Sequence, residues 1–394
     1  MNNLDIIIFG AGIAGLWTLA RLRQQGYNAI LLEIDAIGAG QTIKSQGIIH
    51  GGLKYALAGK LNAATTSLQD MPRLWQECLQ GTGEIDLSAV KILADGQYMW
   101  SANKVTGGIA TLFASNSLKS LVKAVTKVNW PLAINNAAIA SKLYKLQEVV
   151  LDVPSLLQAL ADQLLPYCIK IDSDYKLEID EDNHIKSVTI NHGSNKLQLI
   201  AQQYIFTAGS GNEALTKNLS NAPIMQRRPL QMVIVKSKNL LPVFGHCIGL
   251  ASVPRLTITT HTAKDGTPIW YLGGKLSEEG VSKSSQALIN FAQQELATLF
   301  PKIDLSAAKY ATFFVDRAEA KQDNGSKPNS TTMFSNNNYI TAWPTKLAFA
   351  PLLAQQILDK LQQSNIKPKF KELDLQQYNL PHPNIALPIW DQLL

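Results

Sequence analysis

Three glycines near the N-terminus have the spacing of a loop that binds a dinucleotide. They follow a short apolar run and precede a helix-like segment. In this pattern the first glycine permits a tight turn, the second lets backbone N–H groups approach a pyrophosphate, and the third allows close contact between helix and strand. A helix N-terminus also stabilises anionic oxygen. We therefore expect the phosphates of a dinucleotide to be held by the backbone of Gly10, Ala11, Gly12, Ile13, Ala14 and Gly15.

The segments around this loop form a strand–turn–helix–strand unit. Ile6–Phe9 is a continuous apolar run, as expected of a strand covered on both faces. The helix should end near Gly26, and Ala29–Leu32 forms a second apolar strand that runs into Glu33. A carboxylate at this position can accept both ribose hydroxyls of an adenosine. The alternative, a glycine-rich turn that binds no ligand, accounts for neither the two flanking strands nor the acid.

Residues 34–60 are rich in glycine and small polar residues and become apolar around His50. The side chains in this segment that can donate to phosphate or ribose are Thr42, Ser45 and Gln46. Glycine lets backbone pass close to a flat ring, here at Gly47, Gly51 and Gly52. We expect this loop to lie beneath the cofactor.

The N-terminal unit and the run from Ser45 to Tyr55 together resemble the D-amino-acid-oxidase-like superfamily of FAD enzymes. Residues 50–55, His-Gly-Gly-Leu-Lys-Tyr, look most like flavin-linked glycerol-3-phosphate dehydrogenases, and the Ser45, Gly47 and His50 pattern is also similar to L-2-hydroxyglutarate oxidases. The resemblance implies an α/β fold with a Rossmann-like FAD-binding domain and a second, mainly antiparallel α+β substrate domain. It implies noncovalent FAD, with covalent attachment at His50 as a weaker alternative.

Later segments extend the resemblance. Gln203–Asn212 resembles the strand and Ala-Gly turn that close the sheet against FAD, and Trp343-Pro-Thr-Lys-Leu stands where the superfamily points a last helix at the flavin pyrimidine. The commoner version of that second segment is rich in glycine. The cofactor contacts expected outside the N-terminal third are Leu177, Ala208, Gly209, Pro344, Thr345, Lys346 and Leu347.

The predicted elements divide the chain into two domains and a tail. We expect residues 1–60, 148–215 and 321–365 to form the FAD-binding domain, 61–147 and 216–320 the substrate domain, and 366–394 a C-terminal tail that packs on the body. In the substrate domain strands outnumber helices, which favours an antiparallel sheet. Its strands are predicted at 231–236, 255–260, 268–273 and 311–315, with one helix at 284–299.

Three further predictions concern the FAD-binding domain. Residues 168–200 alternate apolar and polar in three short runs, which predicts a β-meander. Residues 321–338 are polar with turn residues throughout, which predicts a loop. Pro344 is expected at the first position of a helix that reaches about Leu361, because proline is pre-organised for that position.

Oxidation of an alcohol or amine by hydride transfer to flavin N5 also needs a group that takes up the O–H or N–H proton. His50 is the candidate, because histidine titrates near neutral pH and His50 lies in the glycine-flanked segment. An equally open interpretation is that His50 only hydrogen-bonds the flavin or the backbone. Lys346 near the pyrimidine would favour the anionic reduced form.

A small anionic substrate would require an arginine, whose fork matches carboxylate or phosphate. Arg317 is the first choice, because it follows the strand 311–315, where superfamily members often place such a residue. Its alternative role is an ion pair with Asp316 or Glu319. Tyr271 is a candidate for a hydroxyl in the site, although an aromatic residue in an alternating strand more often lies in the core. The remaining arginine candidates are Arg227, Arg228 and Arg255.

The composition of the chain limits the kinds of ligand and cellular compartment that we expect. The net charge of +6 over 394 residues is spread without a basic block, which favours anionic ligands over nucleic acid. The odd number of cysteines, with no CxxC pair, argues against disulfides and zinc. The cysteine pattern fits a reducing cytosol, so we expect a cytoplasmic protein, with a peripheral membrane contact left open. No apolar run is long enough to span a bilayer.

The sequence supports a flavoenzyme that oxidises a small 2-hydroxy acid, polyol phosphate or amino acid. The single glycine motif predicts no separate NAD site, so the electrons should come from the substrate. Whether they leave to oxygen, a quinone or a protein stays open. The alternatives are a tRNA-modifying flavoenzyme of the same superfamily and a non-catalytic FAD-binding subunit that docks through its apolar C-terminal tail.

Overall fold

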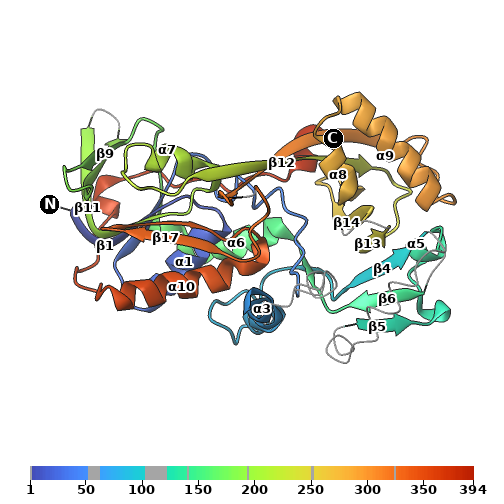
Figure 1. Cartoon of the computed structure of the whole chain (residues 1–394), viewed down its shortest axis with the longest axis horizontal. Coiled ribbons are helices and arrows are strands. Elements are labelled where there is room, and N and C mark those ends of the chain that lie inside the picture. Colours follow the sequence, from blue (N-terminus) through green and yellow to red (C-terminus); the bar gives the residue numbers. More distant parts are fainter. Residues whose placement is uncertain are drawn as a thin grey trace.

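Two eight-stranded sheets form the frame of the protein in the computed structural model (Figure 1). The structure describes residues 2–51, 63–102, 122–139, 142–192, 195–249, 253–323 and 325–394. The predicted loop residues Gly52–Tyr55 therefore lie outside the described part. The first strand after the gap at residues 103–121 is β5 (Val122–Val125).

The first sheet contains the predicted nucleotide unit. Its centre is β1 (Asn2–Phe9), which lies parallel between β2 (Ala29–Glu33) and β11 (Asn195–Phe206). Ile6, Ile7 and Ile8 have no exposed surface, as expected of a strand covered on both faces. The path of the sheet is β17-β18-β11-β1-β2-β8, and its other members are β8 (Cys168–Lys170), β9 (Lys176–Ile179), β10 (Ile185–His192), β17 (Thr332–Asn336) and β18 (Tyr339–Trp343).

Helices bury one face of this sheet. The helix α1 (Ile13–Gln24) packs between α10 (Ala350–Gln363) and α6 (Val153–Leu164), and the longer α3 (Ala63–Leu79) contacts α10. The N-terminus of α6 is capped by Asp152, whose carboxylate accepts from the Ser155 N–H. The shorter helices are α5 (Leu132–Asn135), α7 (Asn212–Thr216) and α11 (Ile389–Leu393).

The second sheet is mainly antiparallel, as predicted, with one parallel pair between β13 and β4. In Figure 1 the long strand β12 (Met225–Lys236) runs from the first sheet toward the second lobe, and β16 (Lys309–Ala320) pairs with it along its whole length. The helices α8 (Lys275–Gly280) and α9 (Ser285–Leu299) cover one face. The remaining strands are β4 (Gln97–Ser101), β5, β6 (Leu143–Leu146), β13 (Gly245–Ile248), β14 (Leu256–Thr262) and β15 (Pro268–Gly273).

Three sequence predictions for the first sheet were wrong. The segment 168–200 is not one meander, because β8 pairs in parallel with β2 and only β9, β10 and β11 run antiparallel. The polar loop 321–338 contains β17, which gains its backbone partners from β18. The last helix opens at Ala350, with Pro351 in its first turn, since Trp343 still belongs to β18. In each case strand pairing determined the structure, and the local amino-acid composition did not.

The C-terminal tail packs on the body, as expected. An isolated bridge joins Ile385 to Ile37, and Trp390 is buried in a core cluster against Tyr271. The small pair of β3 (Ile92–Ala94) and β7 (Val150–Leu151) stands apart from both sheets. In the described part of the chain, no helix has the length and apolar character needed to cross a membrane. The domain boundaries themselves stay a prediction.

Candidate active site

A cavity of about 630 Å³ is lined by residues of both sheets. One side is formed by residues at the carboxyl ends of β1, β2 and β11, where open parallel sheets place their ligands. The other side is formed by Leu230, Met232 and Val315 on β12 and β16. Most predicted site residues line it: Gly10, Gly12, Ile13, Ala14, Glu33, Thr42, Ser45, Gln46, His50, Ala208, Gly209, Arg317, Pro344, Thr345, Lys346 and Leu347.

The glycine loop has the close packing that its spacing predicts. Gly10 has φ +100°, and a Cβ there would lie 2.5 Å from the Ala208 Cα. A Cβ on Gly15 would lie 2.0 Å from the Gly10 carbonyl oxygen, so helix and turn touch. Gly12 is the N-cap of α1 and has no side chain to cap the helix. Apart from the Ile13 N–H, which donates to Thr42, the helix N-terminus is therefore open toward the cavity.

Glu33 lies at the end of β2 and lines the cavity. Its carboxylate accepts from the Ala11 N–H at 2.6 Å and from the Asp35 N–H at 2.7 Å. Burial raises the pKa of Glu33, and these backbone hydrogen bonds act in the opposite direction. Ala11 thus fixes the position of the Glu33 carboxylate and does not itself line the cavity.

The loop after β2 offers polar groups to a ligand. Thr42 accepts from the Ile13 N–H at 3.0 Å, which fixes the loop to the start of α1. Ser45 lines the cavity with a buried hydroxyl that has no hydrogen-bond partner among the described residues. A buried hydroxyl without a partner is costly, so a bound group that accepts or donates there would satisfy it. The open helix end and this hydroxyl fit a bound dinucleotide.

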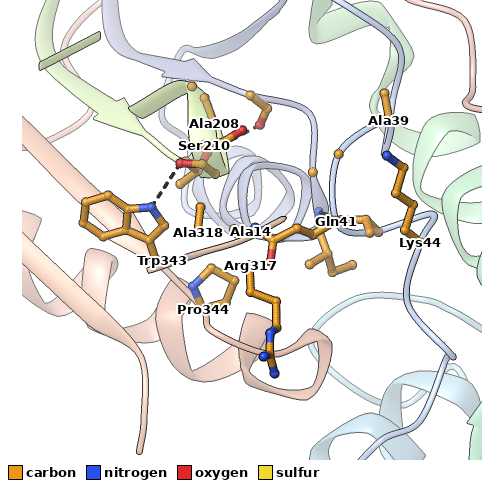
Figure 2. A pocket seen from close by; sticks show the side chains of 18 of the residues that line it. Ala14, Ala39, Gln41, Lys44, Ala208, Ser210, Arg317, Ala318, Trp343 and Pro344 are labelled. Carbon is orange, nitrogen blue, oxygen red and sulfur yellow. Dashed lines mark hydrogen bonds between the residues drawn. The ribbon is translucent and has the colours of Figure 1, made fainter. Parts of the chain in front are cut away.

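The far wall comes from segments distant in sequence. The Trp343 indole donates to the Gly209 carbonyl at 3.1 Å, the bond drawn in Figure 2. Thr345 has φ +61° and its hydroxyl donates to the Ser330 carbonyl. The Ala208 N–H donates to the Asn212 side chain at 2.8 Å. The strand ends of β11 and β18 are thereby held together beside the glycine loop.

His50 lines the same cavity, and its side chain is 27% exposed. The Nδ1 atom lies 3.1 Å from Oε2 of Glu148. The structure thus places a titratable ring in the cavity with a carboxylate behind it, an arrangement that can accept a proton.

Arg317 extends into the cavity, with Trp343 and Pro344 on one side and Lys44 on the other (Figure 2). Its Nε donates to the Arg228 carbonyl at 3.1 Å. Among the described residues no carboxylate lies within ion-pair distance of Arg317. The two acids expected as its ion-pair partners bind other arginines: Glu319 binds Arg228, and Asp316 binds Arg227 at 2.9 Å. Burial, together with the charge of Arg228, lowers the pKa of Arg317.

Tyr271 and Leu177, both predicted site residues, lie away from the cavity. Tyr271 is fully buried on β15, and its hydroxyl donates to the Lys44 carbonyl, so the structure contradicts a direct role toward substrate. Leu177 on β9 packs against the core cluster on the face of the first sheet opposite α1, because its strand pairs with β10. Gly47 and Gly15 do not line the cavity either. Gly47 accepts from the Leu151 N–H, and its φ of +72° favours glycine.

Sequence reasoning missed several residues of the site. Lys44 and Gln41 line the cavity, but they lie among many small polar residues that carry no pattern. Glu148 and His246 were also missed. Each is a polar residue inside an apolar segment, and such a residue is informative when it proves to be buried.

Comparison with known proteins gives the family. Residues 5–320 match the family model described as DAO, FAD dependent oxidoreductase. A probable FAD-dependent oxidoreductase of Pseudomonas aeruginosa is 41% identical over 396 residues, which cover 99% of this chain and 98% of that protein. The crystal structure of an FAD-dependent oxidoreductase from Pseudomonas aeruginosa superposes with a TM-score of 0.85 at 36% identity, covering 99% of this chain and 98% of that one.

More distant structures share the fold alone. Glycine oxidase from Geobacillus kaustophilus has a TM-score of 0.66 at 14% identity, covering 97% of this chain and 99% of that one. The L-alpha-glycerophosphate oxidase of Mycoplasma pneumoniae has a TM-score of 0.64 at 13% identity, covering 92% and 95%.

The comparisons correct one sequence prediction. The glycerol-3-phosphate dehydrogenase of Bacillus halodurans has a TM-score of only 0.58 at 13% identity, with 94% of this chain and 66% of that one covered. The short motif at residues 50–55 therefore overstated that kinship. The matched family model and the relative at 41% identity agree on the cofactor and the reaction class. The chain belongs to the DAO family of FAD-dependent oxidoreductases.

Proposed function

We propose that the protein oxidises a small anionic substrate, a 2-hydroxy acid, polyol phosphate or amino acid, whose anionic group is bound by Arg317. Bound FAD supplies the acceptor for the two electrons. The chain's own residues bind the substrate, orient it and take up its proton. The observation that carries this proposal is a half-buried guanidinium that lines the cavity without a carboxylate partner in the described part of the chain.

An arginine in that state favours an anionic ligand. Burial and the charge of Arg228 lower the pKa of Arg317, while the charges of Glu278 and Glu319 act in the opposite direction. A bound carboxylate or phosphate would supply the missing negative charge and match the planar fork. Asp316 also lines the cavity, but its carboxylate binds Arg227.

The strand register supports a small substrate with a short apolar part. Arg317 is paired with Arg228, and the next residues on the same face are Val315 with Leu230. The side chains of Leu230, Met232 and Val315 line the cavity beyond the guanidinium. The anionic end would bind at Arg317, and the carbon chain would lie on this apolar surface toward His50. Several structural neighbours act, by their names, on small anions of this kind.

The test starts with anaerobic flavin bleaching by a panel of hydroxy acids, amino acids and polyol phosphates. For any substrate that bleaches the flavin, Arg317→Met should raise KM about 30- to 4,000-fold, because losing a desolvated charge contact costs roughly 2–5 kcal/mol. Arg317→Lys should restore only part of the affinity. Arg73→Met is the matched control, since Arg73 is exposed on α3, pairs with Glu77 and does not line the cavity.

An unchanged KM in Arg317→Met, with a lower melting temperature, would make Arg317 a stability residue and refute the anchor. A tRNA-modifying enzyme is the second candidate. It rests on a local match of 36% over 83 residues to a bifunctional tRNA 5-methylaminomethyl-2-thiouridine biosynthesis protein from Chromohalobacter salexigens, which covers 18% of this chain and 12% of that protein. Flavin bleaching by a free small substrate would decide against it.

A further inference from the structure

Three titratable side chains form a cluster at the cavity: His50, which lines it, and the buried Glu148 and His246. Glu148 is 4% exposed and stands between β6 and β7, while His246 is 5% exposed on β13. The ligand atoms of the three side chains all lie within 4.8 Å of one another, and the two imidazole rings are 6.2 Å apart at 25°. The second sheet and the loop after β2 thus bring together residues that are almost 200 positions apart.

We propose that Glu148 is a positioning residue that holds His50 with Nδ1 protonated, so that Nε2 is the atom that accepts the substrate proton, and that His246 is a second imidazole acting on the same carboxylate. This inference rests on the proposed function, in which the substrate loses an O–H or N–H proton.

The hydrogen bonds of Glu148 define the tautomer. Burial alone would raise the pKa of Glu148, but the charge and hydrogen bond of His50, the charge of His246 and the Gly51 N–H together hold the pKa at about 2. The Gly51 N–H and the His50 Nδ1 face the two carboxylate oxygens, and an ionised Glu148 can only accept from them. One oxygen accepts from the Gly51 N–H at 2.9 Å, so the hydrogen in the 3.1 Å contact with His50 must be carried by Nδ1. The tautomer of His50 follows from this.

His246 is held by its own partner. Its Nδ1 lies 2.9 Å from the Thr257 hydroxyl on the neighbouring strand β14. Two imidazoles thus face one carboxylate, and a positive charge on either ring is compensated by Glu148. The other charged groups that line the cavity with His50 include Lys44, Arg317 and Lys346.

The step that these residues carry out is one proton transfer. The substrate O–H or N–H bond breaks, the proton goes to Nε2 of His50, and the imidazolium charge is balanced by the Glu148 carboxylate. The oxidation itself belongs to the flavin. Two histidines and a carboxylate are also ligand types for a divalent metal, so metal content is one outcome of the test.

The experiment follows the histidine rings directly. The chain has six histidines, so selective ¹⁵N-histidine labelling of the oxidised holoenzyme gives a countable NMR spectrum. We expect native His50 to show a protonated Nδ1 in its neutral form. Glu148→Gln should lower the pKa of His50 by about 1–3 and shift its proton to Nε2, because the carboxylate is lost and the amide can donate to Nδ1. His246→Asn should raise the pKa of His50, since one competitor for the same carboxylate is removed.

The kinetic readout is the pH profile of anaerobic flavin reduction with an accepted substrate. Glu148→Gln should slow reduction about a hundredfold or more and move its acidic limb, whereas Glu148→Asp should recover part of the rate. Unchanged His50 tautomer and pKa in Glu148→Gln would overturn the proposal. If Glu148→Gln does not fold, the His246→Asn protein provides the test. An unaltered pKa of His50 in His246→Asn would then overturn the proposal.

The metal content of the purified protein is the third readout, since one equivalent of a divalent metal that is lost in Glu148→Gln would also overturn the proton role. The NMR readouts need no substrate. Their failure is therefore separate from a failure of the Arg317 test.

Discussion

Gly12 and Gly15 differ in what surrounds them, which allows the cofactor role of the glycine loop to be separated from its structural role. A Cβ on Gly12 would meet only the Thr42 hydroxyl, at an ordinary 3.4 Å, and the φ of Gly12 is −72°. A Cβ on Gly15 would instead lie 2.0 Å from the Gly10 carbonyl oxygen. The variants Gly12→Ala and Gly15→Ala each add one methyl group, with opposite expected consequences.

For Gly12→Ala we expect a folded protein that binds FAD weakly. Alanine in place of glycine at an N-cap costs about 0.5–1 kcal/mol of stability. The methyl group would keep the pyrophosphate away from the open helix N-terminus. Losing two hydrogen bonds to a charged group, at roughly 1.5–3 kcal/mol each, weakens binding by about 3–6 kcal/mol. The dissociation constant of FAD should then rise about 10²- to 10⁴-fold.

For Gly15→Ala the strain falls on the fold itself, because backbone of the turn must move to admit the methyl group. Such overpacking typically costs about 1–3 kcal/mol and more when backbone is displaced. The assay compares the ratio of flavin to protein absorbance in the purified variants, FAD titration of the apoproteins, and urea unfolding of the apoproteins. Full flavin occupancy in Gly12→Ala would refute the phosphate role. Equal destabilisation of the two apoproteins would refute the steric reasoning.

Three buried groups lead to further predictions. Tyr271→Phe should lower the free energy of unfolding by about 1–3 kcal/mol in urea, because the Lys44 carbonyl loses its donor. The value of kcat/KM should stay native, and a large loss of kcat/KM would indicate that Tyr271 acts on the substrate. Burial lowers the pKa of His261 to about 3, below its unfolded value, so the unfolded chain binds the extra proton between about pH 6.5 and 3. The free energy of unfolding should therefore fall as pH drops through that window, by about 1.4 kcal/mol per pH unit, and a His261→Phe protein with the same slope would contradict this. Trp390 is 1% exposed and stacks on His261 at 4.6 Å, so Trp390→Ala should cost about 3–5 kcal/mol and expose the tail to limited proteolysis; native stability and a protected tail would show that the tail is held elsewhere.

The amino-acid sequence by itself determined the nucleotide-binding half of this protein. The residues Gly10, Gly12, Gly15 and Glu33 act through local geometry, since one turn, one helix and two adjacent strands bring them together within 24 residues. Local patterns also placed β15 and α9, which the sequence predicted at 268–273 and 284–299. These segments predicted a dinucleotide, and the resemblance carried by them together with residues 45–55 implied FAD and the fold class.

Only the tertiary structure decided the catalytic half. Local composition hid β17, whose backbone partner is β18, and misplaced the start of α10, because Trp343 still pairs with Thr332 and a 3-10 turn at Leu347–Phe349 precedes the helix. The sequence left open whether Arg317 pairs with Glu319, and the structure pairs Glu319 with Arg228 and places Arg317 along the cavity. The contact of His50 with Glu148 spans 98 positions and has no local signature. Such pairs are fixed by how two sheets pack, which is a property of the whole chain and not of any segment in it.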